Sequence, residues 1–377
     1  MLNIIFIKYH LNSAGGLEKY FSRIIDAFLN KGYKITILTA NNSKKKSSNN
    51  LKIVTFKDFK IFKFLKLKIF DFRCYLWLKK NKAKTVFSFD RTSFFTHTRL
   101  GNGLHKTYLK RRKIFESAFK SFFNKINPLH RIILKIEKKG FEQKNLKKVI
   151  VNSKMVQNEL LKEYNFDPKK IKVILNGVEF NELENSFLNW QKEKAIFAKK
   201  INLNPHSFHI VFIGNDYKRK GLKFLLKALS NLKNLDFHLS VIGKDKNMKK
   251  YVSFAKKNKI DKKVSFFGPR NDIINFLQLA DSFILPTLYD PFANAVIEAI
   301  AMGIFVITSK YNGAKEIITN ENGIVLDPLD IDTFTKSLLF AIQTKKNFEN
   351  SKKIRQTVRK LDFSNQLKTL INEVITS

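Results

Sequence analysis

The sequence predicts an α/β protein of two doubly wound domains, each built on a parallel sheet. Short apolar runs bounded by turns alternate with longer periodic segments, which is the rhythm of repeated β-α-β units. This rhythm pauses near residue 177 and restarts after about residue 200. The length of 377 residues suits two ordinary domains, each with its own apolar core, better than one large domain.

The first predicted domain spans residues 1–177. Its apolar runs predict strands at Asn3–Ile7, Lys34–Thr39, Thr85–Ser88 and Lys148–Asn152, with helices between them. The run from Met1 to Tyr9 is too short for a signal-peptide core and lacks a small-residue cleavage site, so we expect a buried first strand there. Residues 41–50 form a low-complexity tract, which predicts a mobile loop.

The second predicted domain spans residues 178–357 and begins after the turn pair Asn176-Gly177. Strands are predicted at His209–Ile213, His238–Ile242, Val264–Phe267, Ser282–Leu285, Phe305–Thr308 and Ile324–Val325. The last helical stretch begins near Lys353. Its part from about residue 358 to residue 377 is a candidate to pack back on the first domain.

Charge and cysteine content restrict the partners and the compartment. The chain has 71 basic and 31 acidic residues, a formal charge of +40, which attracts nucleic acid, anionic lipid or phosphorylated glycolipid. A compositional preference for Lys and Phe is the alternative origin of this excess. The single cysteine, Cys74, excludes an internal disulfide and a Cys-based zinc cluster, so we expect a cytoplasmic protein. No run approaches the roughly 18 apolar residues that span a bilayer.

Two segments concentrate the positive charge. Residues 106–148 carry 14 Lys or Arg against three Glu, and residues 44–84 carry 14 against two acidic residues. In the first segment, apolar residues recur at three- and four-residue spacing: Phe115, Phe119, Phe122, Phe123, Ile126, Leu129, Ile132 and Ile133. This pattern is typical of a basic amphipathic helix that lies on an anionic membrane, although core aromatics among solvated cations are the alternative.

Ligands of open parallel sheets bind at the carboxyl ends of the strands, so the loops there carry the candidate site. A glycine pair, Gly15-Gly16, follows the first strand and opens a helix, where amides approach a phosphate or sugar unless the pair is a simple tight turn. In the second domain the loop from Gly214 contains Arg219 and Lys220, cations that suit a diphosphate leaving group unless they form a solvated charge run.

The most informative segment runs from Leu285 to Ala299. A strand ends in a loop whose amides open a helix, which predicts an anion site for phosphate. Glu298 stands in an otherwise apolar stretch, where a carboxylate needs a partner, and ribose hydroxyls are suitable donors. Asp290 precedes the helix, so we expect it to face the sugar ring rather than the ribose.

The segment from Asp290 to Glu298 resembles the acidic pair, separated by seven residues, of the retaining glycosyltransferase family 4. Gly15-Gly16, Asn176-Gly177-Val178, Arg219-Lys220-Gly221 and Asn312 to Ile317 agree with that family in order and spacing. The resemblance implies the GT-B architecture, in which two Rossmann-like domains face each other across a donor cleft. Within the family the chain most resembles the lipopolysaccharide core glucosyltransferases of Gram-negative bacteria.

The resemblance also assigns roles to particular residues. It implies that Arg219 and Lys220 hold the diphosphate, that Glu298 binds the ribose, and that Phe292, Ala293 and Asn294 place amides near phosphate and sugar. Gly214 joins this donor-binding set. Asp290 departs from the family, which usually has glutamate there, and the shorter side chain withdraws the carboxylate by roughly one ångström.

Another glycine-containing stretch, Arg99 to His105, resembles a segment of some lipopolysaccharide-type members. His105 is therefore a candidate to contact the donor sugar or the leaving phosphate, with a structural role as the alternative. The family is retaining, with the leaving phosphate taking the proton of the acceptor, so the resemblance implies neither a metal nor another cofactor. The sequence shows no clustered metal-ligand set either.

Together these features predict a peripheral enzyme of the inner membrane. It moves a hexose, with UDP-glucose as the leading donor, to a lipopolysaccharide or lipooligosaccharide core acceptor. A nucleic-acid-binding protein is one alternative, although no helix-turn-helix, ribonucleoprotein or zinc-finger pattern supports it. Another GT-B enzyme, such as a nucleotide-sugar epimerase or a phosphorylase, is the second alternative.

Overall fold

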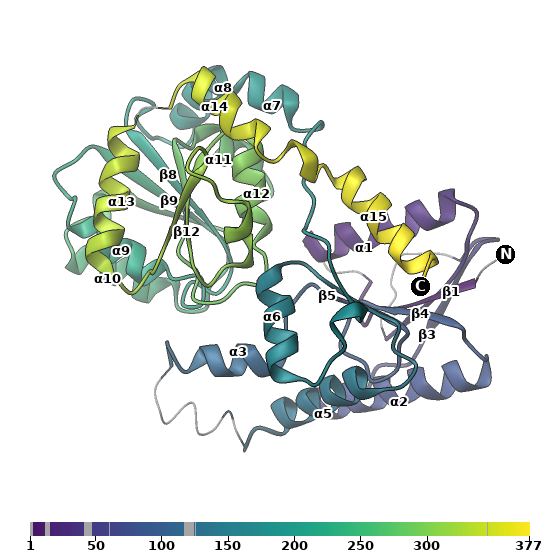
Figure 1. The fold of residues 1–377 in the computed structure, drawn as a ribbon. Helices are drawn as coiled ribbons and strands as arrows, with labels where there is room; N and C mark the ends of the chain where they lie inside the picture. Colours follow the sequence, from purple (N-terminus) through teal and green to yellow (C-terminus); the bar gives the residue numbers. More distant parts are fainter. Residues whose placement is uncertain are drawn as a thin grey trace. The chain divides into compact units, whose positions relative to one another are not determined.

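The computed structural model describes residues 3–11, 16–40, 47–59, 61–116, 124, 126–344 and 346–377. The chain forms two compact units, which are described separately (Figure 1). Unit 1 comprises Met1–Leu175 and Gln366–Ser377, and unit 2 comprises Asn176–Asn365. The first change of unit follows Leu175, two residues before the predicted boundary, and the chain returns to unit 1 at Gln366.

Unit 1 is built on a seven-stranded parallel sheet in the order β3-β2-β1-β4-β5-β6-β7. The strands are β1 (Asn3–Ile7), β2 (Lys34–Thr39), β3 (Leu51–Thr55), β4 (Thr85–Ser88), β5 (His97–Leu100), β6 (Lys148–Val151) and β7 (Ile171–Val173). The helices are α1 (Gly16–Asn30), α2 (Lys63–Lys80), α3 (His105–Arg112), α5 (Pro128–Glu142), α6 (Lys154–Glu163) and α15 (Phe363–Ile375), with a 3₁₀ turn at Pro168–Lys170.

Helices cover both faces of this sheet. On one face, Phe70 and Cys74 of α2, Phe141 of α5 and Val156 of α6 pack against the strands. On the other face, α1 packs together with Leu370, Ile371 and Val374 of α15. Strand residues alternate between the two clusters, as the pleat requires: Ile4 and Phe6 face α1, whereas Ile5 and Ile7 face α2.

The sequence analysis missed β3 and β5 for different reasons. β3 follows the polar tract, of which residues 41–46 lie outside the described residues. β5 has polar residues at buried positions, since His97, Thr98 and Arg99 are all less than 6% exposed. Arg99 and Leu100 therefore belong to a strand and not to the predicted loop. The Thr96 hydroxyl lies 2.8 Å from His97 Nδ1, so a hydrogen bond compensates the burial of that ring nitrogen.

Unit 2 is built on a six-stranded parallel sheet in the order β10-β9-β8-β11-β12-β13. The strands are β8 (Phe208–Ile213), β9 (Phe237–Ile242), β10 (Val264–Gly268), β11 (Ser282–Leu285), β12 (Phe305–Ser309) and β13 (Gly323–Leu326). The helices are α7 (Glu184–Leu188), α8 (Trp190–Lys200), α9 (Leu222–Ser230), α10 (Met248–Lys257), α11 (Ile273–Leu279), α12 (Asn294–Ala301), α13 (Ile331–Gln343) and α14 (Phe348–Gln356), with 3₁₀ turns at Asp261–Lys263, Gly313–Ile317 and Arg359–Leu361.

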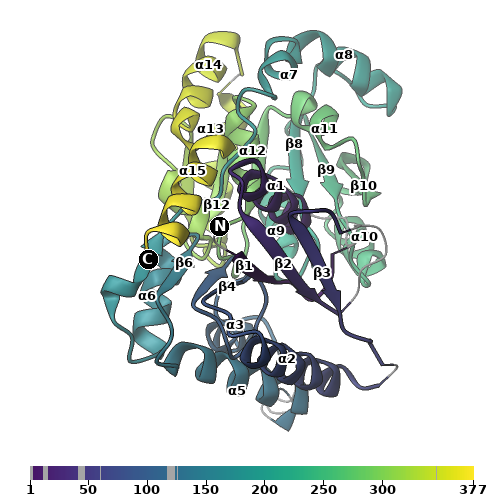
Figure 2. The ribbon, with the colours of Figure 1, turned by 90° about the vertical axis from the view of Figure 1, so that its right-hand side faces the viewer.

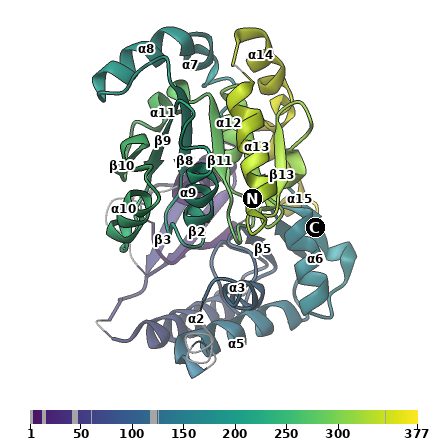
Figure 3. The same ribbon diagram turned by 90° about the vertical axis from the view of Figure 1, so that its left-hand side faces the viewer.

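The strand order of unit 2 reverses between β8 and β11, which pair in parallel. Figure 3 views the unit from the side on which α9 and α13 lie over the sheet. α8 packs against α11, and α12 packs against α14. A reversal of strand order opens a crevice at the carboxyl ends of the two strands, so the loops after β8 and β11 hold the position where ligands of such sheets bind.

The last helical stretch is interrupted, contrary to the single helix predicted from Lys353. α14 ends at Gln356, and α15 begins at Phe363. Between them the chain pairs with Val178, whose amide donates to the Leu361 carbonyl while its carbonyl accepts from the Phe363 amide. α15 then joins unit 1, where Glu373 lies 2.6 Å from Lys172.

Both units have the predicted parallel α/β architecture, which confirms the fold class. Within the described part of the chain, every helix is too short or too polar to cross a membrane.

Candidate active site

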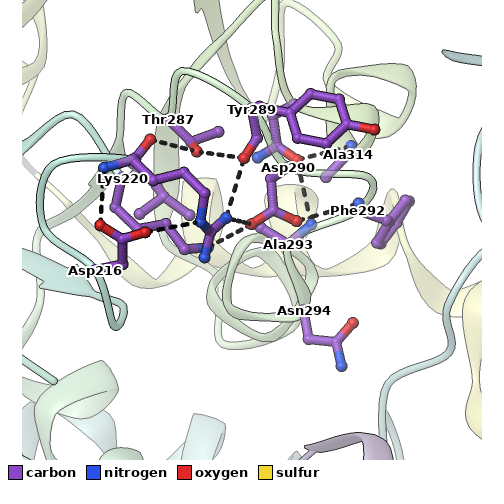
Figure 4. A network of polar contacts seen from close by, with 12 residues as sticks. Asp216, Lys220, Thr287, Tyr289, Asp290, Phe292, Ala293, Asn294 and Ala314 are labelled. Atoms are coloured by element: carbon purple, nitrogen blue, oxygen red, sulfur yellow. Dashed lines mark hydrogen bonds and ion pairs between the residues drawn. The ribbon is translucent and has the colours of Figure 1, made fainter. Parts of the chain in front are cut away.

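Two loops of unit 2 meet at the carboxyl ends of β8 and β11. The loop after β8 carries Arg219, whose carbonyl accepts from the Leu288 amide at 2.7 Å and from the Thr287 hydroxyl at 3.1 Å. These bonds hold the loop after β8 against the loop after β11. Figure 4 shows the polar network that results.

Two glycines permit this close approach. Gly221 has a φ of +78°, and a Cβ built on it comes within 1.9 Å of the Pro286 carbonyl oxygen, so a larger residue separates the two loops. A Cβ on Gly214 lies 3.0 Å from Cγ of Lys220. Gly214 therefore leaves room for the aliphatic stem of Lys220, a role different from the predicted contact with the donor.

Three predicted residues, Arg219, Lys220 and Asp290, form one ion cluster. Lys220 Nζ lies 2.5 Å from Asp290 Oδ2, and Arg219 Nη1 lies 3.2 Å from the same oxygen. Arg219 also donates to the Tyr289 carbonyl and lies 3.5 Å from Asp216. Burial alone would raise the pKa of Asp290, but Lys220 and then Arg219 outweigh it and hold that pKa below its usual range.

Asp290 uses both carboxylate oxygens within the protein. Oδ2 receives the two cations, and Oδ1 accepts from the Phe292 amide at 3.2 Å. The side chain is almost fully buried. The sequence analysis placed this carboxylate against the sugar ring, whereas its contacts in the structure make it the counter-ion of the Arg219–Lys220 pair.

The predicted loop amides are also partly occupied. The Ala293 amide donates to Oδ1 of Asn312 at 3.2 Å, and the same oxygen accepts from the Ala314 amide at 3.1 Å. Asn312 is fully buried and donates to the Thr308 hydroxyl at 3.0 Å. The amides of Phe292 and Ala293 thus have partners within the loop, and their contact with phosphate stays a prediction.

The helix that follows supplies other donors. α12 begins at Asn294, and the preceding residue, Ala293, provides no side-chain cap. The amides of Asn294 and Ala295 precede the intrahelical hydrogen bonds and lie at the positive end of the helix dipole, next to the ion cluster in sequence. The candidate phosphate site therefore keeps the predicted Asn294 and extends by one residue to Ala295.

Glu298 and Asn294 occupy the same face of α12, since they stand four residues apart. Glu298 is half-buried. The Asn294 side chain accepts from Asn176 at 2.6 Å, so the predicted Asn176-Gly177-Val178 motif contacts the start of this helix. At the other end of α12, Arg355 donates to the carbonyls of Ala301 and Phe180 and fixes the helix.

The remaining predicted residues belong to unit 1. Gly15 lies outside the described residues, and Gly16 is the first residue of α1. His105 opens α3, and its Nε2 lies 3.0 Å from Nδ1 of His130. Its backbone amide donates to the buried Glu137 at 2.7 Å. Burial, then Arg91, lowers the pKa of His105 to about 3, so these contacts fit the structural alternative.

Two residues at the centre of the network were absent from the predicted site. Asn312 was quoted only as part of a motif, and Thr287 only as part of the segment from Leu285 to Ala299. A buried Asn beside a strand end was the available signal for the first. Among the described residues, no group of three or more His, Cys, Asp or Glu gathers in a way that holds a metal ion.

Comparisons with known proteins agree with this architecture. A family model of group 1 glycosyl transferases matches residues 193–361, and a model of glycosyltransferase family 4 matches residues 14–182. A glycosyltransferase of Methanocaldococcus jannaschii is 31% identical over 189 residues, 49% of this chain and 48% of that protein. The UDP-Gal:alpha-D-GlcNAc-diphosphoundecaprenol alpha-1,3-galactosyltransferase of Escherichia coli is 29% identical over 185 residues, 48% of this chain and 47% of that protein. The chain spans about half the length of these curated relatives.

Solved structures match over the full length. The structure of WaaG, a glycosyltransferase involved in lipopolysaccharide biosynthesis, has a TM-score of 0.81 at 19% identity and covers 99% of this chain and 100% of its own. HepE from Anabaena in complex with UDP-glucose has a TM-score of 0.74 at 14% identity and covers 100% of both chains. At such identities the likeness extends to the fold.

Proposed function

The chain belongs to the family 4 glycosyltransferases of the GT-B fold, and from this premise we propose that it transfers a hexose from a nucleotide diphosphate-sugar to a glycolipid. The observation that carries the proposal is the pairing of Arg219 and Lys220 at the reversal of strand order, beside the uncapped start of α12. Two cations and a helix N-terminus form an anion site that suits a diphosphate.

The proposed role of this site is to stabilise the leaving group. As the bond between the sugar and the diphosphate breaks, negative charge grows on the phosphate oxygens. Arg219 and Lys220 offset that charge, and the amides of Asn294 and Ala295 offer further donors. Since two side-chain cations already supply positive charge, we propose that transfer needs no metal ion and no other cofactor.

Asp290 gives the site a defined state without the donor. Its carboxylate contacts both cations, which are the groups that we assign to the diphosphate. A bound diphosphate then competes with Asp290 for the same donors, and its departure lets them return. In this proposal Asp290 positions the cations and aids nucleotide release, while Glu298 binds the ribose.

The proposed donor and acceptor follow the descriptions of similar proteins. UDP-glucose is the proposed donor, because one relative is named for UDP-Gal and one structural neighbour is described with UDP-glucose. A lipopolysaccharide or lipooligosaccharide core is the proposed acceptor, because WaaG is described as part of lipopolysaccharide biosynthesis. Retention of the anomeric configuration and a place at the cytoplasmic face of the inner membrane follow from the family resemblance.

Calorimetry with UDP-, GDP- and ADP-sugars tests the donor site directly. We expect one nucleotide class to bind and to raise the melting temperature by mass action. Transfer to a purified core acceptor, followed by NMR of the new anomeric centre, tests the reaction and its stereochemistry. Absence of binding to every nucleotide sugar, together with tight salt-dependent binding of nucleic acid, would overturn the proposal.

A further inference from the structure

α2 and α5 pack side by side in one layer on the sheet of unit 1. Figure 2 shows them together at the end of the unit where α3 also lies. α2 turns Phe70, Cys74 and Leu78 toward the sheet, and α5 turns Ile136 and Phe141 inward. The opposite faces of both helices therefore point away from the sheet on the same side of the unit.

The outward surface of α2 is unusually apolar. Phe72 is 57% exposed and Leu76 is 48% exposed, and the two stand four residues apart on one stripe of the helix. Phe62, which precedes the first turn of α2, is 74% exposed. Large apolar side chains that gather on one face mark an interaction surface, whereas isolated ones do not.

The same surface is strongly basic. Exposed cations on the two helices are Lys63, Lys68, Lys79, Lys80, Arg131, Lys135, Lys138 and Lys139. The structure describes α2 and α5 throughout, and their only exposed carboxylate is Glu142, which lies 3.8 Å from Lys138. The one acidic residue of α2, Asp71, accepts hydrogen bonds from Ser93 and is not exposed.

We propose that this surface, the α2–α5 face, docks on an anionic lipid bilayer. The α2–α5 face consists of Phe62, Phe72, Leu76 and seven of the exposed cations. Lys63 is left out, because it stands seven residues before Phe70 on the stripe of α2 that faces the sheet. Exposed apolar side chains enter the boundary between headgroups and acyl chains, and the surrounding Lys and Arg side chains pair with anionic headgroups. The proposal deepens the proposed membrane association, and its test does not require transfer activity.

Two other occupants fit this surface less well. A second copy of the chain would bring seven like charges against seven, which opposes association at moderate salt. Nucleic acid suits the charge but not Leu76 or a protruding Phe62, since nucleic-acid interfaces are polar and their aromatics stack on bases from a platform. A bilayer alone satisfies both the charge and the aliphatic exposure.

Flotation of the full chain with vesicles tests this assignment. We expect recovery with vesicles of phosphatidylcholine and phosphatidylglycerol, and recovery at least tenfold lower with phosphatidylcholine alone. The double variant Phe72→Ser/Leu76→Ser and the double variant Lys79→Glu/Lys80→Glu each lower partitioning by about tenfold or more, because each removes part of the apolar or charged contribution.

Unit 2 provides matched controls. Phe340→Ser removes a phenylalanine that is 52% exposed on α13, close to the exposure of Phe72. Lys352→Glu/Lys353→Glu reverses an exposed lysine pair on α14 and changes the net charge by the same amount as the α2 pair. We expect both controls to float like the wild type. This result would show that binding depends on the α2–α5 face and not on the net charge of the chain.

Several outcomes would overturn the assignment. Equal recovery with neutral and anionic vesicles would show that anionic headgroups are not needed for binding. An equal loss of recovery in the α2 variants and in the unit 2 controls would show that the α2–α5 face is not the binding surface. If the wild type fails to float but forms a dimer, and the α2 variants do not, the α2–α5 face binds a second copy of the chain. If the wild type fails to float but binds RNA through the same lysines, the α2–α5 face binds nucleic acid. Calorimetry with UDP in parallel shows whether the donor site is intact in each case.

Discussion

Lys220 Nζ lies 2.5 Å from Asp290 Oδ2, although the two residues are 70 positions apart and come from loops after different strands. The contact exists because β8 and β11 are neighbours in the sheet and because Gly214 and Gly221 let the loops close on each other. Both side chains are nearly fully buried, so the carboxylate and the two cations compensate one another's charge. This relationship leads to the next two predictions.

Asp290→Asn should destabilise the free protein and strengthen nucleotide binding. The variant keeps a similar shape but leaves Arg219 and Lys220 without their buried counter-ion, a loss worth about 3 kcal/mol of unfolding free energy. A diphosphate restores the missing negative charge, so we expect the affinity for UDP to rise about tenfold. Denaturant unfolding and calorimetry measure the two effects. Asp216→Asn, at the exposed side of Arg219, is the control and should change both little. Weaker UDP binding by Asp290→Asn would contradict the counter-ion role.

Lys220→Ala should lower kcat for transfer by about 100-fold or more, since the growing charge on the leaving diphosphate loses its nearest cation. Lys223→Ala, three residues further on and exposed on α9, is the matched control. Steady-state kinetics with the identified donor measure kcat for both variants. If the two variants have equal kcat values, Lys220 has no part in leaving-group stabilisation.

Glu298→Ala should weaken donor binding by about tenfold, the effect of losing a hydrogen bond to a charged acceptor. The sharper test uses the 2′-deoxy analogue of the donor. The wild type should bind this analogue more weakly than the natural donor. The Glu298→Ala variant should bind the analogue and the natural donor with equal affinity. Calorimetry of the two proteins with the two ligands gives the coupling free energy between Glu298 and the 2′-hydroxyl. An undiminished preference for the 2′-hydroxyl in the variant would rule out the ribose contact.

The fold was largely predictable, because buried parallel strands appear as continuous apolar runs. Asn3–Ile7 and Ser282–Leu285 were predicted with the bounds that the structure has. β5 escaped because His97 and Arg99 are polar residues in buried positions, and hydropathy alone excludes such a strand. The break between α14 and α15 was not predicted, because it depends on pairing with Val178, a residue that is distant in sequence.

The charged residues of the ion cluster were visible in the sequence, but their contacts were not. A cation pair after one strand and an acidic residue after another were visible, yet the strand order that joins them was not. The contribution of Asn312 to the loop geometry also depends on tertiary structure, because its side chain bonds the Ala293 amide 19 residues away. Sequence spacing therefore assigned the amides of Phe292 and Ala293 to phosphate, whereas internal partners occupy them.

Gly221→Ala should cost at least about 3 kcal/mol of unfolding free energy in unit 2. The substitution combines a left-handed backbone, worth about 1 kcal/mol, with a Cβ that lies 1.9 Å from the Pro286 carbonyl. Gly32→Ala is the matched control: its φ is +82°, and its Cβ meets nothing within 4 Å. The chain has two tryptophans, Trp77 in unit 1 and Trp190 in unit 2, so single-tryptophan backgrounds report each unit separately. Equal losses for the two variants would show that backbone strain alone matters.

Unit 1 should lose stability in mild acid through His105. Burial lowers the pKa of its ring to about 3, whereas the unfolded chain takes up the proton near the ordinary value of about 6.5. The unfolded state then binds more protons, so the stabilising contribution is complete above pH 6.5 and is lost as the pH falls toward 3. One such group contributes at most about 1.4 kcal/mol per pH unit. His105→Gln should reduce the slope of unfolding free energy against pH, read from Trp77, whereas exposed His206→Gln should leave it unchanged. An unchanged slope in His105→Gln would mean that the ring titrates alike in the folded and unfolded states, which would contradict this prediction.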